Sequence, residues 1–176
     1  MTEEKRNILT NIAAGFLTNS AIDTGLYVAM NAPKYKFHLG NENFQKNFKV
    51  NFQNILRDNA VSNVTYYTSI ALLQRFLNKE DEFEKRLYIR IGGSVLSTLA
   101  VEAGFYREKK FRILGSVALS ASTEFAFTLY KDWQKGGKQY AQTHFPAIYK
   151  SVSNSKFAQI YQAQIQQNQQ HPNQDQ

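Results

Sequence analysis

Three acidic residues stand within long stretches that otherwise carry almost no charge. They are Asp23, Glu102 and Glu124. A carboxylate inside an apolar helix is costly unless it is paired or used, so acids of this kind are candidates for a proton relay. The structural alternative pairs each acid with a base of the same chain or with another subunit. The candidate bases are Arg75, Arg90 and Arg107. We expect pairing rather than proton transfer.

The other residues that could do chemistry do not combine into a site. His38, His144 and His171 are scattered, without the spacing that a zinc site needs, and no phosphate-cradling loop occurs. The absence of cysteine excludes disulfides, thiol catalysis and thiolate metal ligands. A net charge of +7 favours an anionic partner, but no aromatic-interleaved basic patch suggests single-stranded nucleic acid. We expect no catalytic, cofactor or metal residues, no small-molecule substrate and no nucleic acid.

Helix is the predicted state of nearly the whole chain before its C-terminal part, because proline is rare and hairpin turn signals are missing. Five helical segments are predicted, over Ile8 to Ala32, Glu42 to Leu56, Val61 to Leu77, Leu87 to Tyr106 and Arg112 to Gln134. The sequence therefore predicts an all-α protein. Two parts are expected, a helical domain over 1–135 and a polar extension over 136–176. Its glutamine-rich end lacks apolar residues, so this end should be disordered or ordered only against a partner.

Four of these segments are predicted to cross a membrane. The mean hydropathy of −0.47 alone favours a soluble bundle. However, only one charge interrupts each of the stretches 7–33, 59–78 and 113–130, and two interrupt 87–106. Such charges are tolerated in a bilayer when they face other protein. The start of the chain resembles neither a signal nor a transit peptide, so any targeting signal should lie inside the mature chain.

Small residues form stripes along three of the predicted spans. Gly93 and Gly115 each begin a Gly-Ser-Val sequence that is followed, at the same distance, by a glutamate. In lipid, small residues allow helix backbones to approach closely. The residues predicted to pack are Ala14, Thr18, Ala21 and Gly25, then Gly93, Ser97, Ala100 and Gly104, and finally Gly115 and Ser122. The three acids should lie on the opposite helix faces.

The segment 42–56 is amphipathic and precedes the second predicted span. Its apolar face consists of Phe44, Phe48, Phe52 and Ile55. A helix of this kind suits a membrane interface or a partner groove, and a core helix has the same pattern. We predict a separate interfacial helix in the first loop.

The region from about Ile8 to Gln134 resembles the four-helix mitochondrial inner-membrane import translocase family. The matching residues are Lys79, Glu80 and Asp81 before the third helix, Gly92 and Gly93 within it, Gly115, Ser116 and Glu124 in the fourth, and Asn31 to Pro33 at the end of the first. The resemblance implies a mitochondrial inner-membrane location. The family also includes an accessory subunit of respiratory complex I, so its architecture does not by itself imply transport.

Bulky residues in the second span favour the accessory role. A helix that guides a polypeptide should be lined by small residues, whereas this one offers Tyr66, Tyr67 and Phe76. We therefore expect a non-catalytic subunit of a respiratory-chain complex, contacting other subunits and phospholipids such as cardiolipin. The alternatives are a core subunit of an import translocase and a soluble helical binding module. Since the loops after the first and third spans are rich in Lys and Arg, both should face the matrix.

Overall fold

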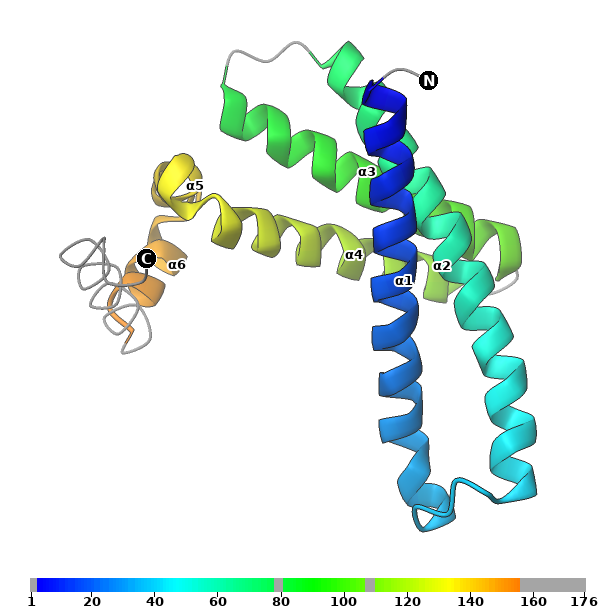
Figure 1. Ribbon diagram of the computed structural model, residues 1–176. Helices are drawn as coiled ribbons and strands as arrows, with labels where there is room; N and C mark the ends of the chain where they lie inside the picture. The colour runs from blue at the N-terminus through cyan, green and yellow to red at the C-terminus, as the bar shows by residue number, and fades with distance from the viewer. Residues whose placement is uncertain (1–2, 78–80, 107–109, 156–176) are drawn as a thin grey trace, which may run out of the picture. The chain divides into compact units, whose positions relative to one another are not determined.

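The computed structural model describes residues 3–77, 81–106 and 110–155, and every regular element in these ranges is a helix (Figure 1). The all-α prediction is confirmed. The chain divides into two compact units, Met1–Phe125 and Ala126–Gln176. The division predicted from the sequence, between 135 and 136, lies further along the chain.

The first unit contains three long helices, a short one and the greater part of a fourth long helix. They are α1 (Glu3–Asn31), the 3-10 helix η1 (Ala32–Tyr35), α2 (Glu42–Phe76), α3 (Glu82–Phe105) and α4 (Lys110–Lys131) up to Phe125. Two side chains cap helix N-termini: Asn41 accepts from the backbone of α2, and Asp81 accepts from the N–H of Glu84 in α3. Lys36 and Phe37 adopt left-handed backbone conformations where the chain turns from α1 toward α2.

The segment predicted as a separate interfacial helix is the first part of α2. The helix runs without a break from Glu42 to Phe76, so the predicted gap between Leu56 and Val61 is wrong. No proline or glycine lies between these positions, and an unbroken hydrogen-bond ladder is the physical consequence.

The aromatic face of this segment makes contacts within the chain. Phe44 is buried, with Tyr35 5.4 Å away between ring centres, and Phe48 lies 6.0 Å from Tyr27 of α1. Phe52 stacks on Phe48, and Ile55 is half-buried. The amphipathic pattern therefore served helix pairing within the unit.

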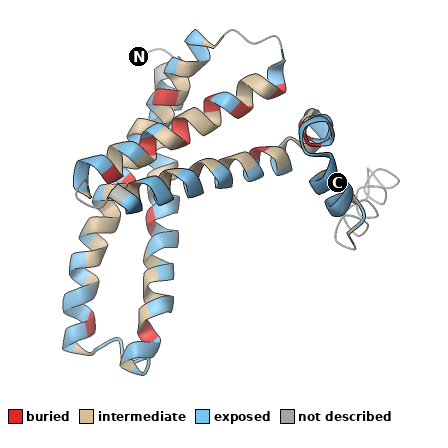
Figure 2. Cartoon of the chain, turned by 180° about the vertical axis from the view of Figure 1, so that it is seen from behind, coloured by how far each residue is buried: buried red, intermediate tan, exposed pale blue. Residues whose placement is uncertain are grey.

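Among the described residues of the first unit, buried polar side chains outnumber buried apolar ones. Figure 2 shows how few residues of the long helices are fully buried. The buried polar ones are Ser20, Asn59, Asn63, Ser69, Ser94, Ser97 and Glu102. Large apolar side chains point outward on every long helix. Examples are Leu17, Leu26 and Met30 on α1, Val64 and Leu72 on α2, Leu96 and Leu99 on α3, and Phe111, Leu114 and Leu119 on α4. The apolar side chains that are buried among the described residues of this unit are Ala32, Phe44, Phe83, Leu87 and Ile89.

One helix in the described ranges is long and apolar enough, by length and composition, to cross a membrane. It covers Phe111–Lys131, with a mean hydropathy of 1.2 and 6% of its most apolar window buried. The other three predicted spans do not reach this hydropathy because polar and charged side chains dilute their apolar residues. The all-α architecture therefore stands, and four membrane spans do not follow from it.

The second unit continues from the end of α4 into short helices. These are η2 (Trp133–Lys135), α5 (Gly137–His144) and α6 (Pro146–Ser153). A side chain at Gly137 would meet the carbonyl oxygen of Leu129 at 2.8 Å, and Trp133 stacks on Tyr149 at 5.8 Å. The glutamine-rich end lies outside the described residues.

Candidate functional site

An ion pair lies at each end of the contact between α3 and α4. At one end, Arg90 of α3 donates from Nε to Glu124 of α4 at 2.6 Å. At the other, Arg112 of α4 donates from Nε to Glu102 of α3 at 3.0 Å. Glu102 is only 7% exposed, so its charge is compensated inside the helix contact.

Hydroxyl groups fill the space between these two ion pairs. The Ser94 and Ser120 hydroxyls share a hydrogen bond, and Thr98 donates to Ser120 at 2.8 Å. Ser116 donates to Glu102 at 2.9 Å. We call this set the polar ladder; it comprises Arg90, Ser94, Thr98 and Glu102 of α3 with Arg112, Ser116, Ser120 and Glu124 of α4.

The sequence repeat explains the polar ladder. Each helix carries an arginine, two hydroxyl residues and a glutamate at every fourth position, and residues so spaced share one helix face. When two such helices run antiparallel, the arginine of each meets the glutamate of the other. The repeated Gly-Ser-Val and glutamate spacing therefore produces a self-complementary pair of faces.

The second helix joins the polar ladder at the Glu124 end. The hydroxyl of Tyr66 donates to Glu124 at 3.1 Å. A side chain at Gly93 would meet Ile70 at 3.0 Å and the Tyr66 ring at 3.4 Å. Since even a methyl group would crowd these neighbours, Gly93 allows α2 and α3 to approach closely.

Polar side chains also join α1 to α2. Asn59 donates to Asp23 at 2.9 Å, and Asn19 donates to Asn63 at 3.3 Å. A side chain at Gly15 would collide with the Asn63 amide. This face of α1 makes the contact through one small and several hydrogen-bonding residues.

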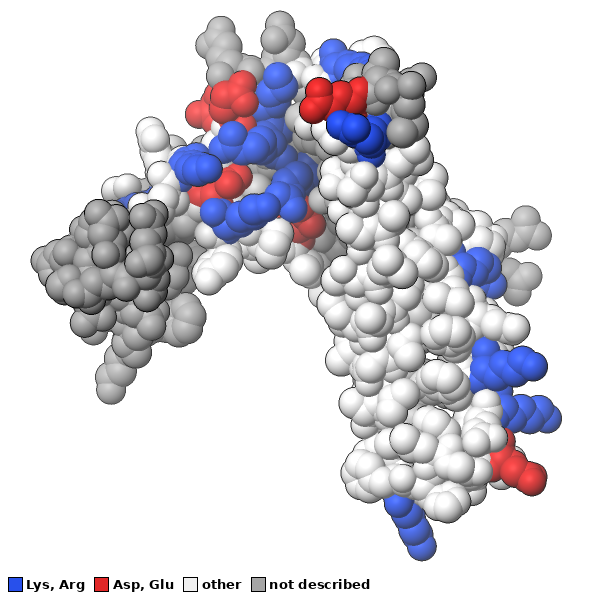
Figure 3. Space-filling model, in the orientation of Figure 1, with Lys and Arg blue, Asp and Glu red and all other residues white. Residues whose placement is uncertain are grey.

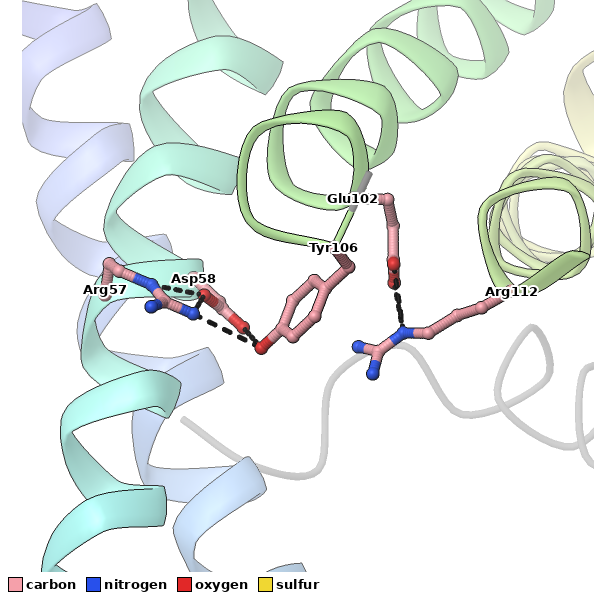
Figure 4. Close-up of polar contacts among 5 residues, drawn as sticks. All are labelled: Arg57, Asp58, Glu102, Tyr106 and Arg112. Atoms are coloured by element: carbon pink, nitrogen blue, oxygen red, sulfur yellow. Dashed lines mark hydrogen bonds and ion pairs between the residues drawn. The ribbon is translucent and has the colours of Figure 1, made fainter. Parts of the chain in front are cut away.

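A cluster of five residues lies where α3 ends (Figure 4). It contains Arg57 and Asp58 of α2, Glu102 and Tyr106, and Arg112 of α4. Tyr106 donates to Asp58 at 2.8 Å, and Arg57 donates to the other oxygen of the same carboxylate at 2.7 Å. The hydrogen bond to Asp58 raises the pKa of Arg57, while burial and then the bond to Asp58 raise the pKa of Tyr106. This five-residue cluster ties α2, α3 and α4 together.

An open pocket of about 180 Å³ lies beside the five-residue cluster. It is lined by Asp58, Asn59, Ser62, Thr98, Val101 and Glu102. Within the described residues no three His, Asp or Glu side chains are grouped as metal ligands.

No family model, curated protein or solved structure matches the chain significantly. The resemblance to the import translocase family therefore remains a prediction. Of its matching residues, Lys79 and Glu80 lie outside the described ranges.

The predicted acids all make contacts between helices. Glu124 pairs with Arg90, which was one of the three candidate bases. Glu102 pairs with Arg112, which was not among them, and Asp23 accepts from an amide rather than from a base. Arg107 lies outside the described residues.

The small-residue stripes pack in only one of the three helices. Gly93 and Ser97 are buried, Ala100 is half-buried, and Gly104 is open. On α1 the stripe makes no packing contact within the chain, because Ala14, Thr18, Ala21 and Gly25 are all exposed. On α4, Gly115 and Ser122 are exposed as well. In α1 and α4 the acid-bearing face makes the contact instead.

Sequence reasoning missed the hydroxyl and amide residues that make these contacts. The signal was present, because Ser, Thr, Arg and Glu recur at every fourth position through α3 and α4. The cluster members Arg57, Asp58 and Tyr106 had no such periodic signal, since they come from different helices.

Proposed function

We propose that the chain is a non-catalytic structural subunit of a mitochondrial inner-membrane complex, and that this complex belongs to the respiratory chain. Its four long helices are embedded in the bilayer and hold neighbouring subunits. The observation that carries the proposal is the distribution of polarity. Asn, Ser, Glu and Arg side chains join the helices, and Leu, Ile and Phe side chains face outward.

This distribution suits lipid better than water. In water, exposed apolar side chains on every long helix would drive association or aggregation. In a bilayer they are solvated by acyl chains, and helices associate through small residues and interhelical hydrogen bonds. Figure 3 shows a long uncharged surface along α1, which is consistent with such contact.

The positions of the ion pairs also suit a bilayer. Arg90 and Glu102 are separated along α3 by about 18 Å, at ~1.5 Å per residue. Only hydroxyl residues lie between the two pairs on the polar ladder. The charges would then lie toward the two membrane surfaces, where their cost is smallest, and face protein instead of lipid.

The length of α2 divides it into a membrane part and an external part. At ~1.5 Å per residue its 35 residues extend about 52 Å, whereas the hydrocarbon core is about 30 Å thick. The five-residue cluster and Asp23 mark the polar boundary, and residues 24–56 lie beyond it as a helical hairpin, which we call the hairpin arm. The cluster brings Arg57, at the base of the hairpin arm, beside Tyr106 and Arg112, which supports a common matrix side for the hairpin arm and for the ends of α3 and α4 that meet there.

Neighbouring subunits are the proposed occupants of the exposed stripe on α1. A side chain at Gly25 would meet no atom within 4 Å, so this position is open in the chain alone. Tyr66, in contrast, already has neighbours within the chain: its ring lies beside Gly93, and its hydroxyl donates to Glu124. This filled position favours a structural role over the translocase alternative, which requires a free groove.

Two experiments test the proposal. Carbonate extraction of isolated mitochondria should leave the protein in the membrane pellet, and its release would support the soluble binding module instead. Acute depletion should then lower a respiratory complex on native gels while precursor import continues at its normal rate. Import arrest with intact respiratory complexes would favour the translocase alternative.

A single substitution tests the subunit contact. Gly25→Leu leaves the chain's own contacts intact, and leucine favours helix more than glycine does. It should nevertheless displace the protein from its high-molecular-weight complex. Leucine at the exposed Gln142 is the matched control and should not.

A further inference from the structure

Two arginines approach the same aromatic ring at the end of α3. The guanidinium carbon of Arg112 lies 3.8 Å from the centre of the Tyr106 ring, and that of Arg57 lies 5.9 Å from it. Arg57 also lies 4.0 Å above the Phe105 ring. Both side chains remain well exposed, at 40% for Arg57 and 44% for Arg112.

The carboxylates of the five-residue cluster occupy only part of each guanidinium. Arg112 uses its Nε for Glu102, and its two terminal nitrogens have no hydrogen-bond partner among the described residues. Figure 4 shows these nitrogens pointing away from Glu102. The carboxylate oxygens, in contrast, are engaged: Asp58 accepts from Arg57 and Tyr106.

The position of the five-residue cluster determines which anions the terminal nitrogens of Arg112 can meet. Under the proposed function, on which this inference rests, the five-residue cluster lies at the membrane boundary, where lipid phosphates are concentrated. A planar guanidinium whose two terminal nitrogens are free can donate both N–H groups to one phosphate in bidentate geometry. The aromatic rings hold both arginines in place and reduce the conformational entropy that binding would cost.

We propose that Arg112 and Arg57 bind the phosphate of an anionic phospholipid headgroup. Arg112 supplies the bidentate contact through its terminal nitrogens. Arg57 adds a second positive charge on the other side of Tyr106. Asp58 and Glu102 accept hydrogen bonds from Arg57 and Arg112, and they compensate the charges of the two arginines when no lipid is bound. The lipid would therefore join the ends of α3 and α4 to α2.

Native mass spectrometry of the purified full-length chain in detergent micelles tests this site. The wild type, titrated with phosphatidylglycerol or phosphatidylcholine, should retain phosphatidylglycerol preferentially. The double variant Arg112→Gln/Glu102→Gln preserves the net charge and a hydrogen-bonding pair but removes the guanidinium. It should bind phosphatidylglycerol about tenfold more weakly, the loss expected for one charge-assisted contact.

Two further variants separate the headgroup site from general charge and from misfolding. Lys49→Gln removes one positive charge from the exposed surface of the same helix α2 and should change binding less than twofold. Arg112→Lys keeps the charge without the bidentate geometry and should lose an intermediate amount. Circular dichroism should show unchanged helix content in all variants.

Three results would overturn the inference. They are equal retention of both lipids by the wild type, unchanged binding in the double variant, and displacement of the lipid by millimolar inorganic phosphate. The last result would identify a site for the free ion. If the protein resists carbonate extraction and the double variant binds normally, the headgroup site fails while the membrane role stands. Release of the protein by carbonate would refute both the headgroup site and the membrane role.

Discussion

Arg90 of α3 and Glu124 of α4 form the shorter of the two ion pairs of the polar ladder, at 2.6 Å, and Tyr66 of α2 donates to the same carboxylate. Three helices therefore depend on one carboxylate. Both charged side chains are mostly shielded from solvent, at 25% and 17% exposed. Breaking such a pair leaves an uncompensated charge, whereas exchanging its partners does not.

Removing this carboxylate should strongly destabilise the fold. Glu124→Ala should lower the free energy of unfolding by about 3 kcal/mol, because the half-buried charge of Arg90 loses the carboxylate that compensates it. The exchange Arg90→Glu/Glu124→Arg should recover much of that loss. Thermal unfolding in detergent measures both. Equal loss in the exchange and the single variant would mean that the pair contributes through shape alone.

The close approach of α2 and α3 should make Gly93 intolerant of larger side chains. Gly93→Leu would push against Ile70 and Tyr66 and should cost about 1–3 kcal/mol, as overpacking usually does. Gly104→Leu is the matched control on the same helix, because a side chain there meets no atom within 4 Å. If both variants unfold at the same temperature, the close approach of α2 and α3 does not exclude a larger side chain at Gly93.

The contribution of Tyr106 should disappear at high pH. Burial raises its pKa above the ordinary value of 10.0, so the folded state holds the proton more tightly than the unfolded state. The stabilisation is complete below pH 10 and is lost as the pH rises through the raised pKa. Wild type should therefore be more stable than Tyr106→Phe at pH 8, and the difference should shrink by pH 11. A constant difference would exclude proton linkage at this residue.

The absence of cysteine in the sequence allows single cysteines to map the membrane boundary. Lys49→Cys, on the hairpin arm, should react in mitoplasts only after the inner membrane is made permeable to a maleimide. Ser69→Cys, buried in the proposed membrane part, should resist labelling in both cases. Reaction of Lys49→Cys in intact mitoplasts would place the hairpin arm in the intermembrane space and reverse the topology.

The sequence was sufficient for the helices and insufficient for their contacts. Scarce prolines and the absence of hairpin turn signals predicted an all-α chain because these are local signals. The stripe at Ala14 and Gly25 was assigned to packing because small residues permit close approach of two helices. A small residue does not require such an approach, and no atom of the chain lies close to Gly25. The real partners of Asp23 and Glu102 come from other helices, and only the relative register of α1 with α2 and of α3 with α4 decides them.

The continuity of α2 has a mechanical consequence. From Glu42 to Arg57 the helix extends about 24 Å beyond the five-residue cluster, at ~1.5 Å per residue. A helix without a proline or glycine has no hinge, so a sideways load on the tip of the hairpin arm acts on α2 as on a lever. The pivot lies where Asp58 meets Tyr106. Under the proposed function, a subunit bound to the tip would thereby exert torque on the ends of α3 and α4 at the membrane boundary.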